Sequence, residues 1–213
     1  EITKFINHFR DDPGLKRSVD KIFEIIVYAL FSALVIELGV TIRVSADKNK
    51  LYLLNEFSDF CKEVIGITSE KLYSECPANV YRVGVTNAAD RGLDMWANFG
   101  LAIQIKHLAL TEELTEDIVS SISCDRIVIV CKDAEKKLIL SLLNQLGWKS
   151  RIQSIITEND LIKWYHKAFK GNYSKSLGNK ILSILKNEIK AEFPTSDETD
   201  FKRFCKARGY EIY

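Results

Sequence analysis

The sequence predicts an α/β protein with a central mixed β-sheet flanked by helices and a helical C-terminal extension. A long apolar helix pattern near the N-terminus precedes three closely spaced strand patterns, two of which resemble a hairpin. A further strand pattern is an unbroken apolar run, as expected for a strand covered on both faces. Beyond residue 160 every pattern is helical, and this order favours a sheet with helices packed against it.

Length and composition indicate one folded domain. The chain has 213 residues, of which 46% are hydrophobic and 28% charged, with only 10 Gly and 3 Pro, so disorder and low-complexity arrays are excluded. No linker or repeat divides it. We therefore expect a single domain over residues 1–213, with a core at about 18–156 and a helical part at about 157–213.

Charge and cysteine usage limit the classes of partner and compartment. The chain has 30 Lys and Arg residues and 29 Asp and Glu residues, so its net charge is close to zero. A surface for nucleic acid must therefore come from local segregation of charge. The five cysteines are scattered, without a CxxC pair or zinc-finger spacing to histidine. A reduced, cytoplasmic protein is expected.

No membrane segment is expected. The most apolar stretch, residues 25–36, is shorter than the roughly 20 residues that a membrane-spanning helix needs. No basic region followed by a small-residue cleavage site is present, so secretion is not expected. The chain starts at Glu1 rather than methionine, which leaves excision from a longer protein open.

The N-terminal third predicts two helices and a strand. Ser18 is a favourable N-cap, and the apolar run after it predicts one long, largely buried helix over residues 19–38 that ends at Gly39. A short strand at 41–45 and a helix at 53–65, stopped by Gly66, are the next elements expected.

Three strands follow in quick succession, at residues 80–86, 93–97 and 101–107. Asn98-Phe99-Gly100 predicts a turn that joins the last two as a hairpin. The remaining elements are expected in this order: a helix at 111–122, a buried strand at 126–131, a helix at 133–146, a strand at 152–156 and helices from 160 onward.

The hairpin carries the polar residues that are the best candidates for a binding or catalytic site. Because strand side chains alternate, Gln104 and Lys106 share one face of their strand, and Ile103 points to the other. Asp94 lies on the preceding arm, where antiparallel pairing brings its carboxylate close to them. Three polar groups then converge at one sheet edge. The simpler interpretation is an Asp94–Lys106 ion pair with Gln104 as a solvated neighbour.

Nine residues separate Asp94 from the tripeptide Gln104-Ile105-Lys106. This spacing resembles the active-site motif of the PD-(D/E)XK nucleases, in the variant that has glutamine in place of the second acid. The order of elements from Ser18 to Lys132 is similar to that superfamily's restriction-endonuclease-like core. Together with the apolar helix KIFEIIVYALF, the motif resembles type II restriction endonucleases of the HaeII kind.

The resemblance implies a Mg²⁺ site. Asp94 is the implied anionic ligand, with neutral oxygens from the Gln104 side chain and the Ile105 carbonyl. Lys106 would position the attacking water or neutralise developing charge. In many such enzymes an acid on the first core helix completes the site, and Glu24 occupies that helix. Equally, Glu24 and its helical neighbours could form a solvated stripe.

Two groups of residues are candidates for DNA contact. Lys163, Lys167 and Lys170 recur at helical spacing in a locally basic region, and phosphate contact is favoured over a merely solvated lysine face. The polar loop before the hairpin adds candidates for phosphate or base-edge contact, namely Thr86, Asn87 and Arg91.

The resemblance therefore implies a Mg²⁺-dependent endonuclease that cuts double-stranded DNA at a specific short site, as a homodimer that places one site on each strand. No phosphate loop or dinucleotide fingerprint is present, so no small-molecule cofactor is expected. The alternatives are a structure-specific or methyl-directed nuclease, a nicking subunit with the same core, and a catalytically silent DNA-binding module.

Overall fold

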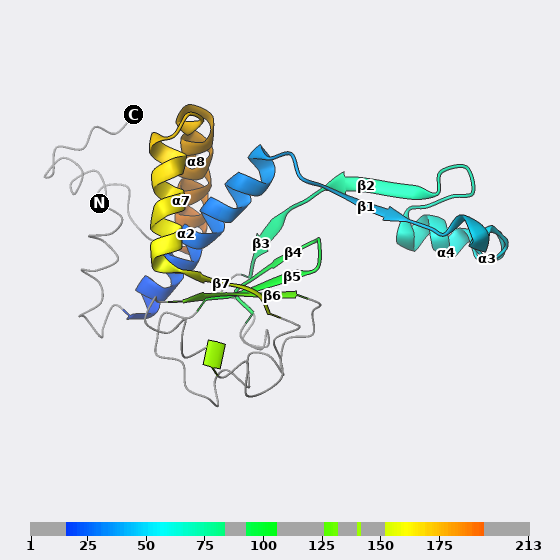
Figure 1. Ribbon diagram of the computed structural model, residues 1–213, viewed down its shortest axis with the longest axis horizontal. Coiled ribbons are helices and arrows are strands. Elements are labelled where there is room, and N and C mark those ends of the chain that lie inside the picture. Colours follow the sequence, from blue (N-terminus) through cyan, green and yellow to red (C-terminus); the bar gives the residue numbers. More distant parts are fainter. Residues whose placement is uncertain (1–15, 84–92, 106–125, 132–139, 142–151, 194–213) are drawn as a thin grey trace, which may run out of the picture.

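The computed structural model describes residues 16–83, 93–105, 126–131, 140–141 and 152–193 (Figure 1). Its helices are α2 (Lys16–Glu37), α3 (Leu51–Glu56), α4 (Ser58–Phe60), α7 (Glu158–Lys170) and α8 (Ser174–Glu192). Its strands are β1 (Thr41–Ser45), β2 (Tyr73–Pro77), β3 (Val80–Arg82), β4 (Met95–Ala97), β5 (Leu101–Ile105), β6 (Arg126–Cys131) and β7 (Ile152–Thr157).

The predicted mixed sheet is confirmed. Five strands are arranged in the order β3-β4-β5-β6-β7, with antiparallel pairing from β3 to β5 and parallel pairing from β5 to β7. The hairpin turn follows β4, and Gly100 has a φ of 80°, a conformation that glycine adopts without strain. β6 is buried over nearly its whole length, as its apolar sequence predicted.

Helix α2 lies at the centre of the hydrophobic core. One cluster of buried residues joins Ile26, Val27 and Leu30 of α2 to the inward side chains of β4, β5 and β6 and to α7 and α8. Figure 1 shows α7 and α8 side by side, with α2 crossing them obliquely next to the sheet. The buried Tyr165 of α7 donates a 2.7 Å hydrogen bond to the carbonyl of Ile26, which fixes α7 on α2.

The first helix of the C-terminal part begins slightly earlier than the predicted residue 160. Thr157 and Asp160 form a reciprocal capping box that starts α7 at Glu158. The helices expected at 111–122 and 133–146 lie outside the described residues, except that 140 and 141 are helical. Among the helices that the structure describes, none is both long enough and apolar enough to span a bilayer.

The segment between β1 and β2 differs from the prediction. β1 lies at residues 41–45 as expected, but it pairs with β2, a strand that was not predicted, in a two-stranded ribbon that projects away from the larger sheet (Figure 1). The helix expected at 53–65 is divided into α3, α4 and a π-helical turn at Cys61–Ile65. An amphipathic helix needs a surface to pack on, and here Phe57, Phe60 and Val64 are exposed. Gly66 ends the segment in the left-handed conformation, as predicted.

Candidate active site

The β4–β5 hairpin brings Asp94 to the end of β5. Met95 pairs with Ile103 in the antiparallel register, so Asp94, just before β4, lies opposite the last residues of β5. The backbone N–H of Ile105 donates a 2.6 Å hydrogen bond to Oδ2 of Asp94. The carbonyl of Asp94 in turn accepts a 2.9 Å bond from the N–H of Val83. Both its backbone and its carboxylate are therefore held in place.

Gln104 has the orientation that strand alternation predicted, but its environment differs. Ile103 and Ile105 belong to the core shared with α2, and Gln104 does not. Gln104 is only 1% exposed, so the interpretation of a solvated neighbour is wrong. β5 is the middle strand of the sheet, flanked by β4 and β6, so the polar groups gather at the end of a central strand rather than at a lateral edge.

Four predicted site residues lie outside the described residues: Lys106, Thr86, Asn87 and Arg91. The approach of Lys106 to Asp94 therefore stays a prediction, as do the DNA contacts of Thr86, Asn87 and Arg91.

Glu24 points into the protein. It is 7% exposed, and Ser32 on the same face of α2 is also buried, so the interpretation as a solvated stripe is wrong. Lys21 donates a 2.8 Å hydrogen bond to Oε2 of Glu24. Burial raises the pKa of the Glu24 carboxyl, the bond from Lys21 partly offsets this, and the charge of Asp94 raises the pKa further. The two carboxylates are thus close enough to repel each other.

Arg82 is a residue of this site that sequence reasoning missed. Its side chain is 6% exposed, and its Nη1 lies 3.9 Å from Oε2 of Glu24. Its Nε and Nη2 lie 2.9 Å and 2.7 Å from carboxylate oxygens of Glu188 and Glu192 on α8. An arginine within an apolar strand pattern was the available signal, because burying such a charge requires acidic partners.

The residue types at this end of β5 suit a hard divalent cation. Asp94 and Glu24 carry carboxylates, and the Gln104 side chain and the Ile105 carbonyl carry neutral oxygens, which are the ligand types that Mg²⁺ prefers. The contact that the structure describes among them is the hydrogen bond from Ile105 to Asp94. Across the described part of the chain, no three His, Cys, Asp or Glu side chains cluster as metal ligands. A cation would relieve the repulsion between the two carboxylates.

The predicted lysines of the C-terminal part share one exposed stripe. Lys163, Lys167 and Lys170 are all exposed on α7, opposite the side that buries Leu161 and Tyr165 against the core.

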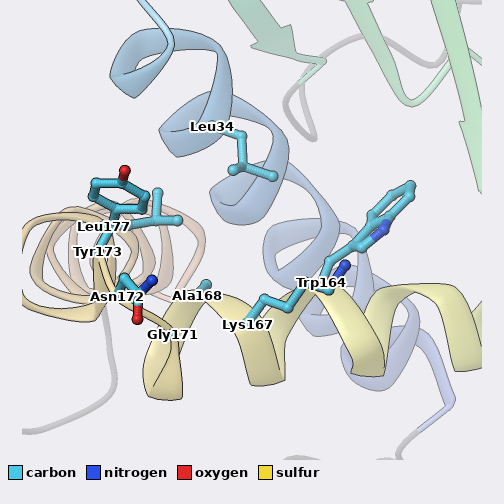
Figure 2. Close-up of a pocket in the computed structure, with 8 residues that line it drawn as sticks. All are labelled: Leu34, Trp164, Lys167, Ala168, Gly171, Asn172, Tyr173 and Leu177. Carbon is cyan, nitrogen blue, oxygen red and sulfur yellow. The ribbon is translucent and has the colours of Figure 1, made fainter.

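An apolar hollow of about 380 Å³ lies beside this stripe, at the turn between α7 and α8 (Figure 2). Leu34 of α2, Trp164 and Lys167 of α7, and Tyr173 and Leu177 at the start of α8 are among its lining residues. Leu34 lies almost three turns of α2 beyond Glu24, so the hollow is not part of the candidate active site.

Comparison with known proteins decides the family. The family model described as HaeII restriction endonuclease matches residues 1–210. The chain belongs to the HaeII restriction endonuclease family. The resemblance expected from the hairpin motif and the long apolar helix is thereby confirmed.

Two named type II restriction enzymes are close relatives within the HaeII family. HaeII of Haemophilus aegyptius is 59% identical over 209 residues, which cover 98% of this chain and 59% of that protein. NgoBI of Neisseria gonorrhoeae is 56% identical over 213 residues, which cover 100% of this chain and 60% of that protein. The chain thus spans about three fifths of the length of these relatives. No solved structure matches it.

Proposed function

We propose that this chain is a single nuclease domain of a type II restriction endonuclease, which hydrolyses phosphodiester bonds of double-stranded DNA at a specific short site. Membership of the HaeII family supports the activity. The observation that carries the mechanism is the placement of the Asp94 carboxylate against the Ile105 backbone at the end of β5, with Glu24 close by.

In this proposal the site is a PD-(D/E)XK site with glutamine at the second acid. Asp94 and Glu24 would hold Mg²⁺ with their carboxylates, and Gln104 and Ile105 would contribute neutral oxygens. The bound ion would stabilise negative charge on the phosphate and lower the pKa of water. Lys106 orients the attacking water or neutralises charge that develops on the phosphate. The hydrogen bond from Ile105 keeps Asp94 aligned with the end of β5.

In this proposal the basic stripe of α7 binds DNA together with Thr86, Asn87 and Arg91, which precede β4 in the sequence. Two copies of the chain related by a two-fold axis would place one site on each strand of a palindrome, so we propose a homodimer.

Neutralising the stripe should weaken DNA binding in a salt-dependent way. For Lys163→Gln, Lys167→Gln and Lys170→Gln combined, we expect the slope of log K against log salt to become less steep by about 3, since each phosphate contact contributes about 0.9. Fluorescence anisotropy with a labelled duplex in Ca²⁺ at several salt concentrations measures this slope.

The matched control replaces three lysines of the segment between β1 and β2, Lys48, Lys50 and Lys62, by glutamine, because they are also exposed. An unchanged slope in the α7 variant, or an equal change in the control, would refute phosphate contact by the stripe.

Substitution of Gln104 by glutamate should make stability depend on a divalent cation. A carboxylate buried at position 104, on the strand end next to Asp94, is destabilising without a cation, and we expect the Tm to fall by about 5 °C. Addition of Mg²⁺ should restore it. Thermal unfolding with Mg²⁺ and with EDTA measures both values.

Gln104→Met is the control, because it keeps the volume and removes the oxygen. It should show no additional stabilisation by Mg²⁺ relative to the wild type. A Gln104→Glu variant with the same Tm in both buffers would count against a cation at this position.

Digestion of a sequenced supercoiled plasmid tests the proposed function. With Mg²⁺, the expected product is a set of linear fragments whose ends all map to one short sequence. Cleavage at structured or methylated positions, nicking alone, or binding without any cleavage would each refute the proposal in favour of a different nuclease or a silent DNA-binding module.

A further inference from the structure

We propose that Arg82 is a positioning residue, which fixes the carboxylate of Glu24 next to Asp94 and connects it to the C-terminal end of α8. This inference rests on the proposed function, because Glu24 acts there as a metal ligand. It adds a link between the C-terminal helix and the candidate active site that the motif does not contain.

The guanidinium of Arg82 distributes its three nitrogens among three acids. Nε lies 2.9 Å from Glu188 and Nη2 lies 2.7 Å from Glu192, so two nitrogens are fixed on α8. The third, Nη1, lies 3.9 Å from Oε2 of Glu24, within ion-pair range but beyond hydrogen-bonding distance. The planar guanidinium makes these directions interdependent, so the position of α8 determines where the positive charge near Glu24 lies.

Two cations approach the same oxygen of Glu24. Lys21 donates to Oε2 at 2.8 Å, and Nη1 of Arg82 lies 3.9 Å from that atom. The carboxylate is thereby held by one oxygen, and its charge is partly balanced although Asp94 is close. Without Arg82 the repulsion between Glu24 and Asp94 would be less balanced, and Glu24 would turn away from the ligand position.

The acids on α8 are difficult to explain by the stability of that helix alone. Glu192 is its last residue, at the negative end of the helix dipole, and Glu188 is one turn earlier, where like charges repel. Glu192 is also nearly buried, with a side chain 5% exposed. The positive charge of Arg82 offsets the unfavourable helix dipole, the repulsion between the two acids and the burial of Glu192. We therefore infer that these two acids hold the guanidinium in position.

Arg82→Gln and Arg82→Lys in the full chain separate positioning from a simple charge effect. We expect both variants to bind Mn²⁺ about tenfold more weakly, as is typical when a group supporting a metal ligand is lost. Binding of Mn²⁺ alone is measured by electron paramagnetic resonance, without DNA and without turnover. The Mg²⁺ concentration for half-maximal cleavage should rise by a similar factor, with DNA affinity in Ca²⁺ unchanged.

Lys180→Gln is the matched control. Lys180 forms a 2.6 Å ion pair with Glu37, which also joins α8 to α2, but at the opposite end of both helices from the candidate site. This variant should lose a comparable ion pair between the two helices and still bind Mn²⁺ with the affinity of the wild type.

The direction of the change decides between the mechanisms. Tighter Mn²⁺ binding in Arg82→Gln would show only that a repelling positive charge was removed, and wild-type affinity in Arg82→Lys would show that charge alone suffices. Either result overturns the positioning role, as does equal weakening in Lys180→Gln.

If Asp94→Asn cuts DNA normally, the proposed function itself fails. If Asp94→Asn is inactive and both Arg82 variants bind Mn²⁺ normally, only this inference fails.

Discussion

Asp94→Asn is expected to reduce cleavage by about a thousandfold, equivalent to about 4 kcal/mol of transition-state stabilisation. The asparagine oxygen can still accept the hydrogen bond that Ile105 donates to Asp94, so the local backbone should be retained. What is lost is the negative charge that holds the cation. The loss should therefore appear in turnover and Mn²⁺ binding, while the Tm without metal stays within about 2 °C of the wild type.

Single-turnover cleavage of a duplex that contains the mapped site measures this effect. Asp47→Asn is the matched control, because Asp47 also accepts a backbone N–H, from Asn49 at 2.9 Å, but in the segment between β1 and β2. Its cleavage rate should equal that of the wild type. A fully active Asp94→Asn variant would remove the proposed metal site.

Lys106→Ala is expected to reduce the cleavage step by a factor of about 10² to 10³, the range for loss of one group that stabilises transition-state charge. Duplex affinity should change little, because the lysines assigned to the phosphate backbone lie on α7. The physical reason is that Lys106 acts at the scissile phosphate, where charge increases during the reaction, and contributes little to the ground-state complex.

Single-turnover rates at saturating enzyme, together with anisotropy in Ca²⁺, separate these two effects. Lys62→Ala is the control, because the Lys62 side chain is 70% exposed and lies in the segment between β1 and β2. It should cut at the wild-type rate. If Lys106→Ala lowers affinity but cuts at the wild-type rate when saturated, Lys106 is a DNA contact and not part of the catalytic site.

The parts of the fold that local patterns determine were predicted well. The strands at 41–45 and 126–131 have the predicted bounds, and the turn at Asn98 to Gly100 forms where it was expected. Each depends on properties of neighbouring residues: β-branched runs, alternation and a glycine with positive φ. The contact between Asp94 and the end of β5 belongs to the same class, because a short hairpin fixes its own register.

The segment between β1 and β2 shows where local patterns fail. Its apolar residues recur at helical spacing, but periodicity does not reveal whether a surface is available to bury them. In the structure the segment stands apart from the main core, and of α3 and α4 only Leu54 is buried. The expected continuous helix is therefore divided, and the partner of β1 is a strand that the sequence pattern did not indicate.

By itself, the sequence determined the individual strands, the long apolar helix and the position of Asp94 beside the end of β5, because each follows from interactions between residues close in the chain. Only the tertiary structure decided that Glu24 is buried near Asp94 and that Arg82 meets Glu188, a residue 106 positions away. The sequence pattern marks such residues as charged, but it does not specify which charges share a site. Packing of α2 between the sheet and α8 brings them together, and the cost of burying a charge without a partner then selects the acids that surround the arginine.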